Sequence, residues 1–244
     1  MTRAQLHSRL RHDESGISLV EWIVAMFVFG IVITLIANLY VSTTRAMDNA
    51  QNTNQNTRSA SNAMNEVARM LRAGTDNPIQ ATGFGTPPPN DPAFVYARNE
   101  SVLFYAFVNL TGTAQQPIQV RLRIDATTRT LSEDIWPATN IGNGYWSFPA
   151  ESTPPQKTRI LADAIAPQTG TAPWTFTYLD ANNNPITTGA GAAGGVANVK
   201  TTLATIAAVQ VSLTVLTKLG VTDHAVTLQN TVGLPNLGQN RVIS

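Results

Sequence analysis

The hydrophobic pattern of the chain begins with one long apolar run. No polar side chain occurs from Trp22 to Ile33, and Thr34 and Asn38 are the main polar interruptions before Val41. As a helix, residues 17–41 would measure roughly 37 Å at 1.5 Å per residue, enough to cross a bilayer core of about 30 Å with some tilt. The pattern predicts a membrane-spanning helix over residues 17–41.

A second helical pattern follows directly, because residues 42–73 contain neither Gly nor Pro. Apolar or small residues recur there at three- and four-residue steps: Met47, Ala50, Thr57, Ala60, Met64, Val67 and Leu71. This spacing is typical of one helix face that packs on an apolar surface. Gly74 then supplies a stop signal. We therefore predict one helix from about Ile17 to Ala73, with an amphipathic continuation over 42–74.

Beyond residue 74 the pattern changes to short segments in which apolar and polar residues alternate. Such segments predict strands at 93–97, 101–109, 120–124, 174–178, 209–215 and 225–230. Residues 133–155 are rich in Pro, Gly and aromatic residues, and we predict a surface excursion there. The fold class expected is α+β, with the long N-terminal helix packed on an antiparallel β-sheet domain over 75–244.

Composition and charge narrow the function classes. The 244 residues fit one tail helix and one globular domain of about 170 residues. The chain has no Cys, which excludes disulfides, cysteine nucleophiles and Cys-based metal sites. A net charge of +1 gives no general electrostatic reason to expect a nucleic-acid partner.

One acid, Glu21, stands at the start of the apolar run. An unpaired carboxylate in a membrane helix costs a few kcal/mol, so such acids usually have a partner. No Lys or Arg occurs between Arg11 and Arg45. A cut between Gly16 and Ile17 would create an α-amino group close to this acid, on the same chain or on a neighbouring one.

The stretch from residue 16 to 21, Gly-Ile-Ser-Leu-Val-Glu, followed by an apolar helix, resembles the class III signal of type IV prepilins and pseudopilins. The resemblance implies that a prepilin peptidase cuts after Gly16, leaving 1–16 as the leader peptide. It also implies that Ile17 becomes the N-methylated first residue and that Glu21 is the assembly glutamate. Ile17 stands where Phe is commonest. Asn38 stands where many major pilins have Pro, which argues against a major-subunit role.

The order of segments in the domain carries a second resemblance. Ile-Leu-Ala-Asp at 160–163, an aromatic strand with Tyr178, an Asp-Asn turn and a terminal Val-Thr-Leu-Gln-Asn at 226–230 are similar to large minor pilins of the PilW kind and to J-type pseudopilins. This resemblance implies a minor pilin that primes or caps a type IV pilus, or a J-type pseudopilin of a type II secretion system. The implied partners are other major and minor pilins, bound through the N-terminal helix.

The flanking charges predict the orientation in the membrane. The leader carries Arg3, Arg9 and Arg11, against Arg45 beyond the helix, which places the leader in the cytoplasm. The protein would cross the cytoplasmic membrane once, with its domain outside, and reach a cell-surface filament after assembly. The alternative from another class is an unprocessed, membrane-anchored envelope binding protein, which would keep Met1.

Other candidate sites are weaker. Asp180, Asn182 and Asn184 have the spacing of the first calcium-loop ligands, but Pro185 and Gly191 replace the Gly and Glu that such a loop needs, so we expect no metal site. Residues 189–194 match the G-x-G-x-x-G pattern of dinucleotide-binding loops. They lack the preceding strand, the following helix and the later acid that such a loop requires, so we interpret them as a hairpin loop.

The sequence signals for a catalytic site and for a DNA-binding surface are also weak. His224 beside Asp223 lacks a nucleophile elbow, so we expect no catalytic residues, no cofactor and no enzyme activity. Arg121, Arg123 and Arg129 could form a basic stripe for DNA, but a solvated strand face is the default. DNA contact therefore stays possible but unsupported.

Overall fold

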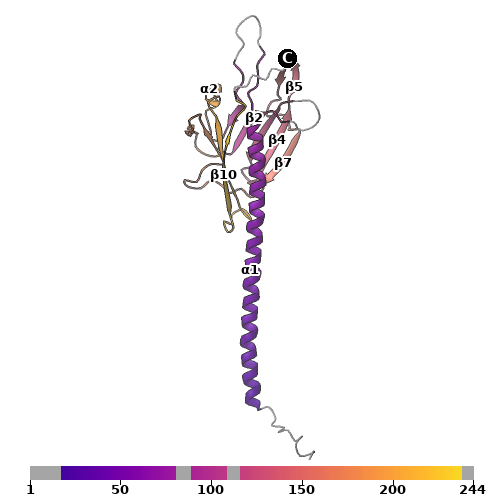
Figure 1. Cartoon of the computed structure of the whole chain (residues 1–244), viewed down its shortest axis with the longest axis vertical. Helices are drawn as coiled ribbons and strands as arrows, with labels where there is room; N and C mark the ends of the chain where they lie inside the picture. The colour runs from indigo at the N-terminus through magenta and orange to yellow at the C-terminus, as the bar shows by residue number, and fades with distance from the viewer. Residues whose placement is uncertain (1–17, 81–88, 109–115, 238–244) are drawn as a thin grey trace, which may run out of the picture. The chain divides into compact units, whose positions relative to one another are not determined.

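The computed structural model of the chain describes residues 18–80, 89–108 and 116–237. It separates into two compact units, Met1–Ala50 and Gln51–Ser244, and each is described by itself. Helix α1 (Leu19–Arg72) has 54 residues and contributes to both units (Figure 1). Its bounds agree with the predicted helix to within two residues. Arg69 and Arg72 occupy its last turn, where cations suit the helix dipole.

In the second unit, α1 buries one face from Asn56 onward. Ala60, Met64, Val67 and Leu71 are buried, as the three- and four-residue spacing predicts. The prediction was wrong at the beginning of this face, because Thr57 is exposed and Asn56 is buried instead. The amide of Asn56 donates hydrogen bonds to Thr217 Oγ1 at 3.0 Å and to the carbonyl oxygen of His224 at 2.9 Å, which compensates its burial. Met47, also assigned to this face, is 69% exposed.

The strands form three antiparallel sheets, and the α+β fold class is confirmed. A five-stranded sheet has the order β1-β2-β3-β4-β7, a three-stranded sheet the order β10-β9-β8, and β5 pairs with β6. The strands are β1 (Phe94–Ala97), β2 (Ser101–Ala106), β3 (Ile118–Ile124), β4 (Leu131–Pro137), β5 (Thr139–Gly142), β6 (Tyr145–Ser147), β7 (Lys157–Ala162), β8 (Phe176–Leu179), β9 (Ala208–Val215) and β10 (Val226–Gly233). A short helix, α2 (Lys200–Leu203), precedes β9.

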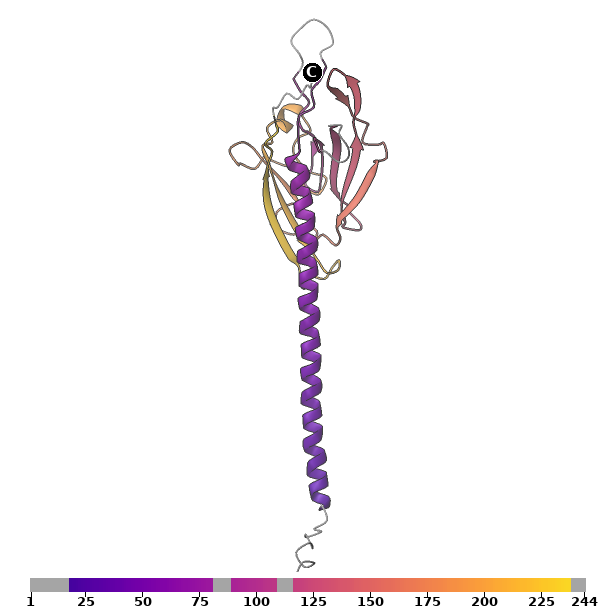
Figure 2. The same ribbon diagram turned by 45° about the vertical axis from the view of Figure 1, so that its right-hand side comes forward.

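One hydrophobic core joins the C-terminal part of α1 to the two larger sheets. Alternate residues of β2 and β3, such as Phe104 and Leu122, lie in this core together with Val211 of β9. Figures 1 and 2 show β10 and the β4–β7 pair on opposite sides of this part of the helix. This part of the helix therefore packs against both the five-stranded and the three-stranded sheet.

The surface excursion predicted for 133–155 is wrong in its first part. Residues 131–136 of β4 are all buried, and Trp136 is 1% exposed. The reason is that both faces of β4 are covered: the core lies on one face, and the segment after β6 folds back over the other. In that segment the Thr153 carbonyl accepts a 2.8 Å hydrogen bond from Trp136 Nε1, and the Phe148 ring lies 4.5 Å from that of Tyr105. The β5 strand remains exposed, as predicted.

The glycine-rich segment 189–194 is a loop, as predicted, and it holds the two sheets together. The side-chain amide of Asn99 donates to the carbonyl oxygens of Gly189 at 3.0 Å and Gly191 at 2.8 Å. A Cβ on Gly195 would lie 2.1 Å from the carbonyl oxygen of Ala97, so only glycine permits this approach. The glycines therefore have a structural reason that needs no nucleotide.

Candidate functional site

The first turn of α1 carries the acid that the sequence singles out. Ser18 precedes the helix, and its Oγ accepts a 3.3 Å hydrogen bond from the Val20 N–H. Glu21 Oε2 in turn accepts a 3.1 Å hydrogen bond from the Ser18 N–H. This reciprocal pattern is a capping box, in which a Ser and a Glu three residues later satisfy amides that the first turn leaves unpaired. The carboxylate of Glu21 is thereby held against the start of its own helix.

Sequence reasoning identified Glu21 but missed this second role. The signal was present, since Ser18 and Glu21 have the capping-box spacing directly before an apolar run. Gly16 and Ile17, the predicted cleavage residues, lie outside the described residues. Ser18 is the second residue of the chain that a cut after Gly16 would leave, so the Glu21 carboxylate binds an amide one residue from that predicted terminus.

After this turn, from Trp22 to Ile33, the helix presents only apolar residues to its surroundings. Every residue from Ser18 to Ala50 is exposed in the described chain. Among the described residues, α1 is the one helix that is both long enough and apolar enough to cross a membrane, judged by length and composition. Thr34, a polar residue in the run, donates from Oγ1 to the Gly30 carbonyl at 2.8 Å and so hides its hydroxyl from lipid. The helix suits membrane anchoring.

The turn predicted as a weak calcium loop satisfies its own polar groups. Asp180 Oδ1 accepts 2.8 Å hydrogen bonds from the N–H groups of Asn182 and Asn184, and Oδ2 accepts one from Asn184 Nδ2 at 3.3 Å. The hydrogen bond from the backbone N–H of Asn184 is the main reason that the pKa of Asp180 lies below its usual value. An ion would have to displace these bonds. No group of three or more acidic or histidine side chains that could hold a metal occurs in the described part of the chain.

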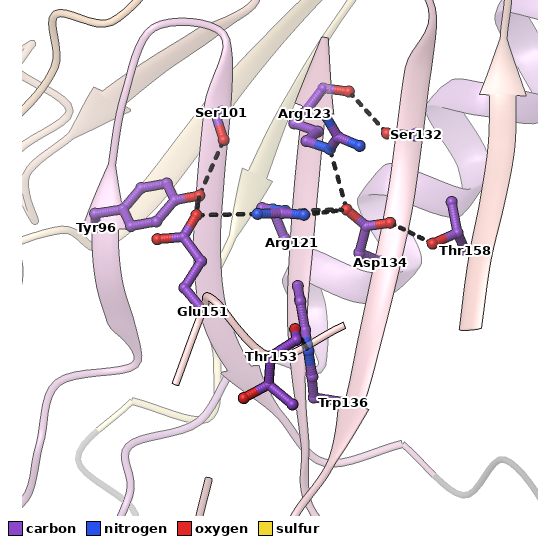
Figure 3. A network of polar contacts seen from close by, with 10 residues as sticks. All are labelled: Tyr96, Ser101, Arg121, Arg123, Ser132, Asp134, Trp136, Glu151, Thr153 and Thr158. Carbon is purple, nitrogen blue, oxygen red and sulfur yellow. Dashed lines mark hydrogen bonds and ion pairs between the residues drawn. The ribbon is translucent and has the colours of Figure 1, made fainter. Parts of the chain in front are cut away.

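The basic stripe that was considered for Arg121, Arg123 and Arg129 does not form. Arg121 Nη2 and Arg123 Nε donate to Asp134 Oδ2 at 2.7 and 3.1 Å (Figure 3). Arg129 lies elsewhere and makes a bidentate pair with Glu100, at 2.8 Å for each bond. The strand register explains the first pairs, because Arg121 lies directly opposite Asp134. Each of these arginines pairs with a carboxylate of the protein, so together they do not present an unpaired basic stripe.

The network on the outer face of the five-stranded sheet extends beyond this ion pair. Glu151, in the segment after β6, accepts hydrogen bonds from Arg121 Nη1 at 3.0 Å and from the Tyr96 hydroxyl at 2.9 Å (Figure 3). The Arg121 guanidinium also lies 5.1 Å from the Trp136 ring centroid. The expected solvated face is therefore wrong for Asp134, which is 1% exposed, and for Arg121, which is 17% exposed, whereas Arg123 remains 40% exposed.

A second acidic cluster lies on the helix side of the same sheet. Glu133 of β4 is buried, and its Oε2 accepts hydrogen bonds from Arg159 Nη2 at 2.7 Å and Nε at 3.1 Å. Arg159 also bonds to Glu66 of α1, which pairs with Arg69. Glu133 Oε1 has no hydrogen-bond partner in the described structure. Burial raises the pKa of Glu133 above its ordinary value of 4.5, outweighing the opposite effect of Arg159.

This raised pKa predicts a pH effect on stability that a Glu133→Gln variant removes. A group whose pKa is raised by folding stabilises the fold at low pH, and this contribution is lost as the pH rises through the folded-state pKa. The difference in unfolding free energy, wild type minus variant, should therefore fall between pH 4.5 and the folded-state pKa of Glu133. Urea unfolding of both full chains in detergent from pH 4 to 8 measures it. A difference that is constant with pH contradicts the prediction.

The histidine and aspartate considered for catalysis do not assemble a site. His224 has φ 62° in the segment between β9 and β10, and its described hydrogen bond is made by its carbonyl oxygen, which accepts from Asn56. No hydrogen bond joins the side chains of Asp223 and His224 in the part of the chain that the structure describes. Their arrangement is that of a surface turn.

Taken together, the described residues define a protein with an apolar N-terminal helix suited to a membrane and a separate antiparallel β-sheet domain. Residues 11–37 match a family model described as the prokaryotic N-terminal methylation motif. The match includes Gly16, Ile17 and Glu21 and ends within the apolar run. No curated protein matches the chain. The N-terminal region is thus of the type IV prepilin kind, and the motif is that of pilin-type structural proteins rather than of an enzyme family.

Proposed function

We propose that this chain is a prepilin that is cut after Gly16 by a prepilin peptidase, methylated at Ile17 and then assembled into a type IV pilus. The observation that carries the proposal is the methylation motif at residues 11–37, whose part from Leu19 onward lies on the helix α1 that continues into a folded domain. In this proposal residues 1–16 are the leader, 17–41 the membrane and filament-core helix, 42–74 its amphipathic continuation and 75–244 the extracytoplasmic domain. The partners are the peptidase and other pilins.

In this proposal, the charge of Glu21 favours the correct register between the helices of two neighbouring subunits. A carboxylate surrounded by lipid or by apolar helices is costly unless a cation pairs with it. The α-amino group of an incoming or adjacent subunit supplies that cation when two helices dock in the correct register. The capping box supports this role, because it orients the carboxylate of Glu21 toward the start of the helix, where the new terminus of the mature chain begins.

The proposed position in the filament is that of a minor subunit that primes or caps it. The order of segments in the domain, with its resemblance to large minor pilins and J-type pseudopilins, favours this position. Asn38, in place of a helix-breaking Pro, favours it too. A pseudopilin of a type II secretion system would use the same leader and the same carboxylate. In both cases the protein crosses the cytoplasmic membrane once before assembly, with its domain outside that membrane, and the pilus subunit lies at the cell surface afterwards.

The mass of the mature N-terminus tests the proposal. Intact-mass and N-terminal peptide measurements on the protein from its native cells should find a chain that begins with N-methyl-Ile17. A Gly16→Leu variant should keep residues 1–16, because the bulky side chain occupies the cleavage position. An intact Met1 in the wild-type protein would instead support an unprocessed anchor of an envelope binding protein.

A further inference from the structure

The outer edge of β10 is a long strand edge that the described residues leave open. β10 ends the three-stranded sheet, and its eight residues pair with β9 without any register shift. Edge strands present unpaired N–H and C=O groups, and most proteins shield such edges against other strands. A long regular edge without shielding is therefore a feature that needs a reason.

The register of β10 identifies which backbone groups face outward. Just past the strand, the Leu234 N–H donates to the Ala207 carbonyl at 3.1 Å, continuing the ladder with β9. Because pairing alternates along an antiparallel strand, the even-numbered residues of β10 face β9. The remaining residues direct their N–H and C=O groups away from the sheet; they are Thr227, Gln229, Thr231 and Gly233, and all four are exposed. Among the described residues, no backbone hydrogen bond from another segment reaches them.

Other segments of the chain block the edges of β1 and β8. The Val196 N–H donates to the Ala97 carbonyl at 2.8 Å, which covers part of the β1 edge. The Ile186 N–H donates to the Tyr178 carbonyl at 2.9 Å, which covers part of the β8 edge. The edges of β1 and β8 are therefore partly closed to the addition of another strand.

The remaining edge of the large sheet, β7, is shielded differently. It carries Lys157 and Arg159, and its pairing with β4 has a register shift near Leu131. Charged side chains and irregular pairing are two ways in which proteins discourage strand addition. From Val226 to Gly233, in contrast, β10 has no charged residue, no Pro and no shift.

The side chains of β10 define what could pair with it. Thr227, Gln229 and Thr231 are exposed on the outer face, whereas Val226 and Leu228 on the inner face are half-buried and pack against the edge of the core. A strand laid along this edge would extend the sheet and cover that apolar margin with every second side chain.

We propose that the outer edge of β10 binds an extended segment of a different protein chain, whose side chains alternate between apolar and neutral polar. The outward N–H and C=O groups repeat every second residue, roughly 7 Å apart, which is the repeat of another extended backbone. The inference rests on the geometry of this strand and does not depend on cleavage or on filament assembly.

A second copy of this chain is a poorer occupant. Asn56 of α1 bonds to His224 just before β10, and the Arg72 carbonyl accepts from Asn236 just after it, so β10 and this part of α1 run in the same direction. Two copies paired antiparallel through β10 would thus direct these helix segments oppositely. That arrangement does not suit two chains anchored in one membrane.

Hydrogen–deuterium exchange at single amides tests the proposal on the full chain in detergent micelles. The probe is a synthetic peptide with the sequence of Ala208–Val215, which alternates as required and pairs with β10 on its other side. The amides of Thr227, Gln229, Thr231 and Gly233 should exchange rapidly in the free chain and about tenfold more slowly with peptide at about 1 mM. The edge amides of β7 should not change.

Two proline variants separate edge binding from loss of folding. Gln229→Pro removes one outward N–H of β10 without removing a bond to β9, and it should abolish the protection by peptide. The matched control is Ile160→Pro on the edge of β7, which should leave that protection intact. Slow exchange of the four amides in the free chain, or no protection by peptide, overturns the proposal. Protection that rises with the concentration of this chain alone assigns the edge to a second copy and overturns the choice of a different chain.

Discussion

A Glu21→Leu variant is expected to insert into the membrane and to be processed, yet to enter filaments at least about tenfold less than the wild type. The proposed cause is the loss of the carboxylate that pairs with the α-amino group of a neighbouring subunit, leaving that amine uncompensated among apolar helices. Each 1.4 kcal/mol of lost pairing corresponds to about tenfold in association. Filaments sheared from cells, quantified by immunoblot against the membrane-bound pool, measure the effect.

Glu21→Gln separates the two roles of this side chain. Glutamine also serves as the distal residue of a capping box, so this variant keeps an acceptor for the Ser18 N–H but lacks the charge. If charge pairing drives assembly, Gln and Leu should fail to similar extents. Normal incorporation of the Gln variant would show that helix capping is the important role, and normal incorporation of the Leu variant would exclude both.

An Asp134→Ala variant is expected to lose about 3–5 kcal/mol of unfolding free energy, the largest stability effect that we predict for the domain. Asp134 is 1% exposed and accepts from Arg121, Arg123 and Thr158, the last at 2.6 Å between Thr158 Oγ1 and Asp134 Oδ1. Its removal leaves the Arg121 guanidinium, whose side chain is 17% exposed, without the buried carboxylate that it binds. Urea unfolding of the full chain in detergent, followed by tryptophan fluorescence, measures the loss.

The matched control is Glu151→Ala, which removes the other carboxylate that Arg121 binds. Glu151 is 41% exposed, so its ion pair is screened by water and its loss should cost about 0–1 kcal/mol. Similar losses in the two variants would contradict the importance of burial for Asp134.

Asp134 also predicts a loss of stability in acid. Burial alone would raise its pKa, but the hydrogen bonds from Thr158, Arg121 and Arg123 outweigh burial and hold the pKa below the ordinary value of 3.8. A lowered pKa stabilises the fold above the unfolded-state value, and this contribution is lost as the pH falls through the folded-state value. The sign is opposite to that of Glu133 on the other face of the same strand.

Local patterns predicted the elements of this fold well. The ends of α1 followed from the apolar run, the absence of Gly and Pro, and the stop at Gly74. Most strands followed from alternation, because each has one face in the core. The capping box of Ser18 and Glu21 is equally local, and the sequence contained what was needed to predict it.

The failures in β4 and at Asn56 concern residues whose environment is set by distant parts of the chain. β4 contains Glu133 and Asp134, which local reasoning assigns to the surface. Their burial depends on Arg121 from β3 and Arg159 from β7, and on a segment that returns after β6. Asn56 likewise breaks the apolar pattern of its helix face, and only Thr217 and His224, more than 160 positions later, explain why it is inside. No periodicity within a short window reports such pairings.

The placement of α1 in its domain has a mechanical consequence. Asn56 ties the beginning of the buried stretch to the segment between β9 and β10, and the bridge between Gly74 and Ala106 ties its end to β2. Between these ties, the helix contacts both large sheets through one continuous core. A tensile load along the helix is therefore distributed over two sheets and many contacts at once. The sheets should thus resist separation from this part of α1, although no disulfide links them.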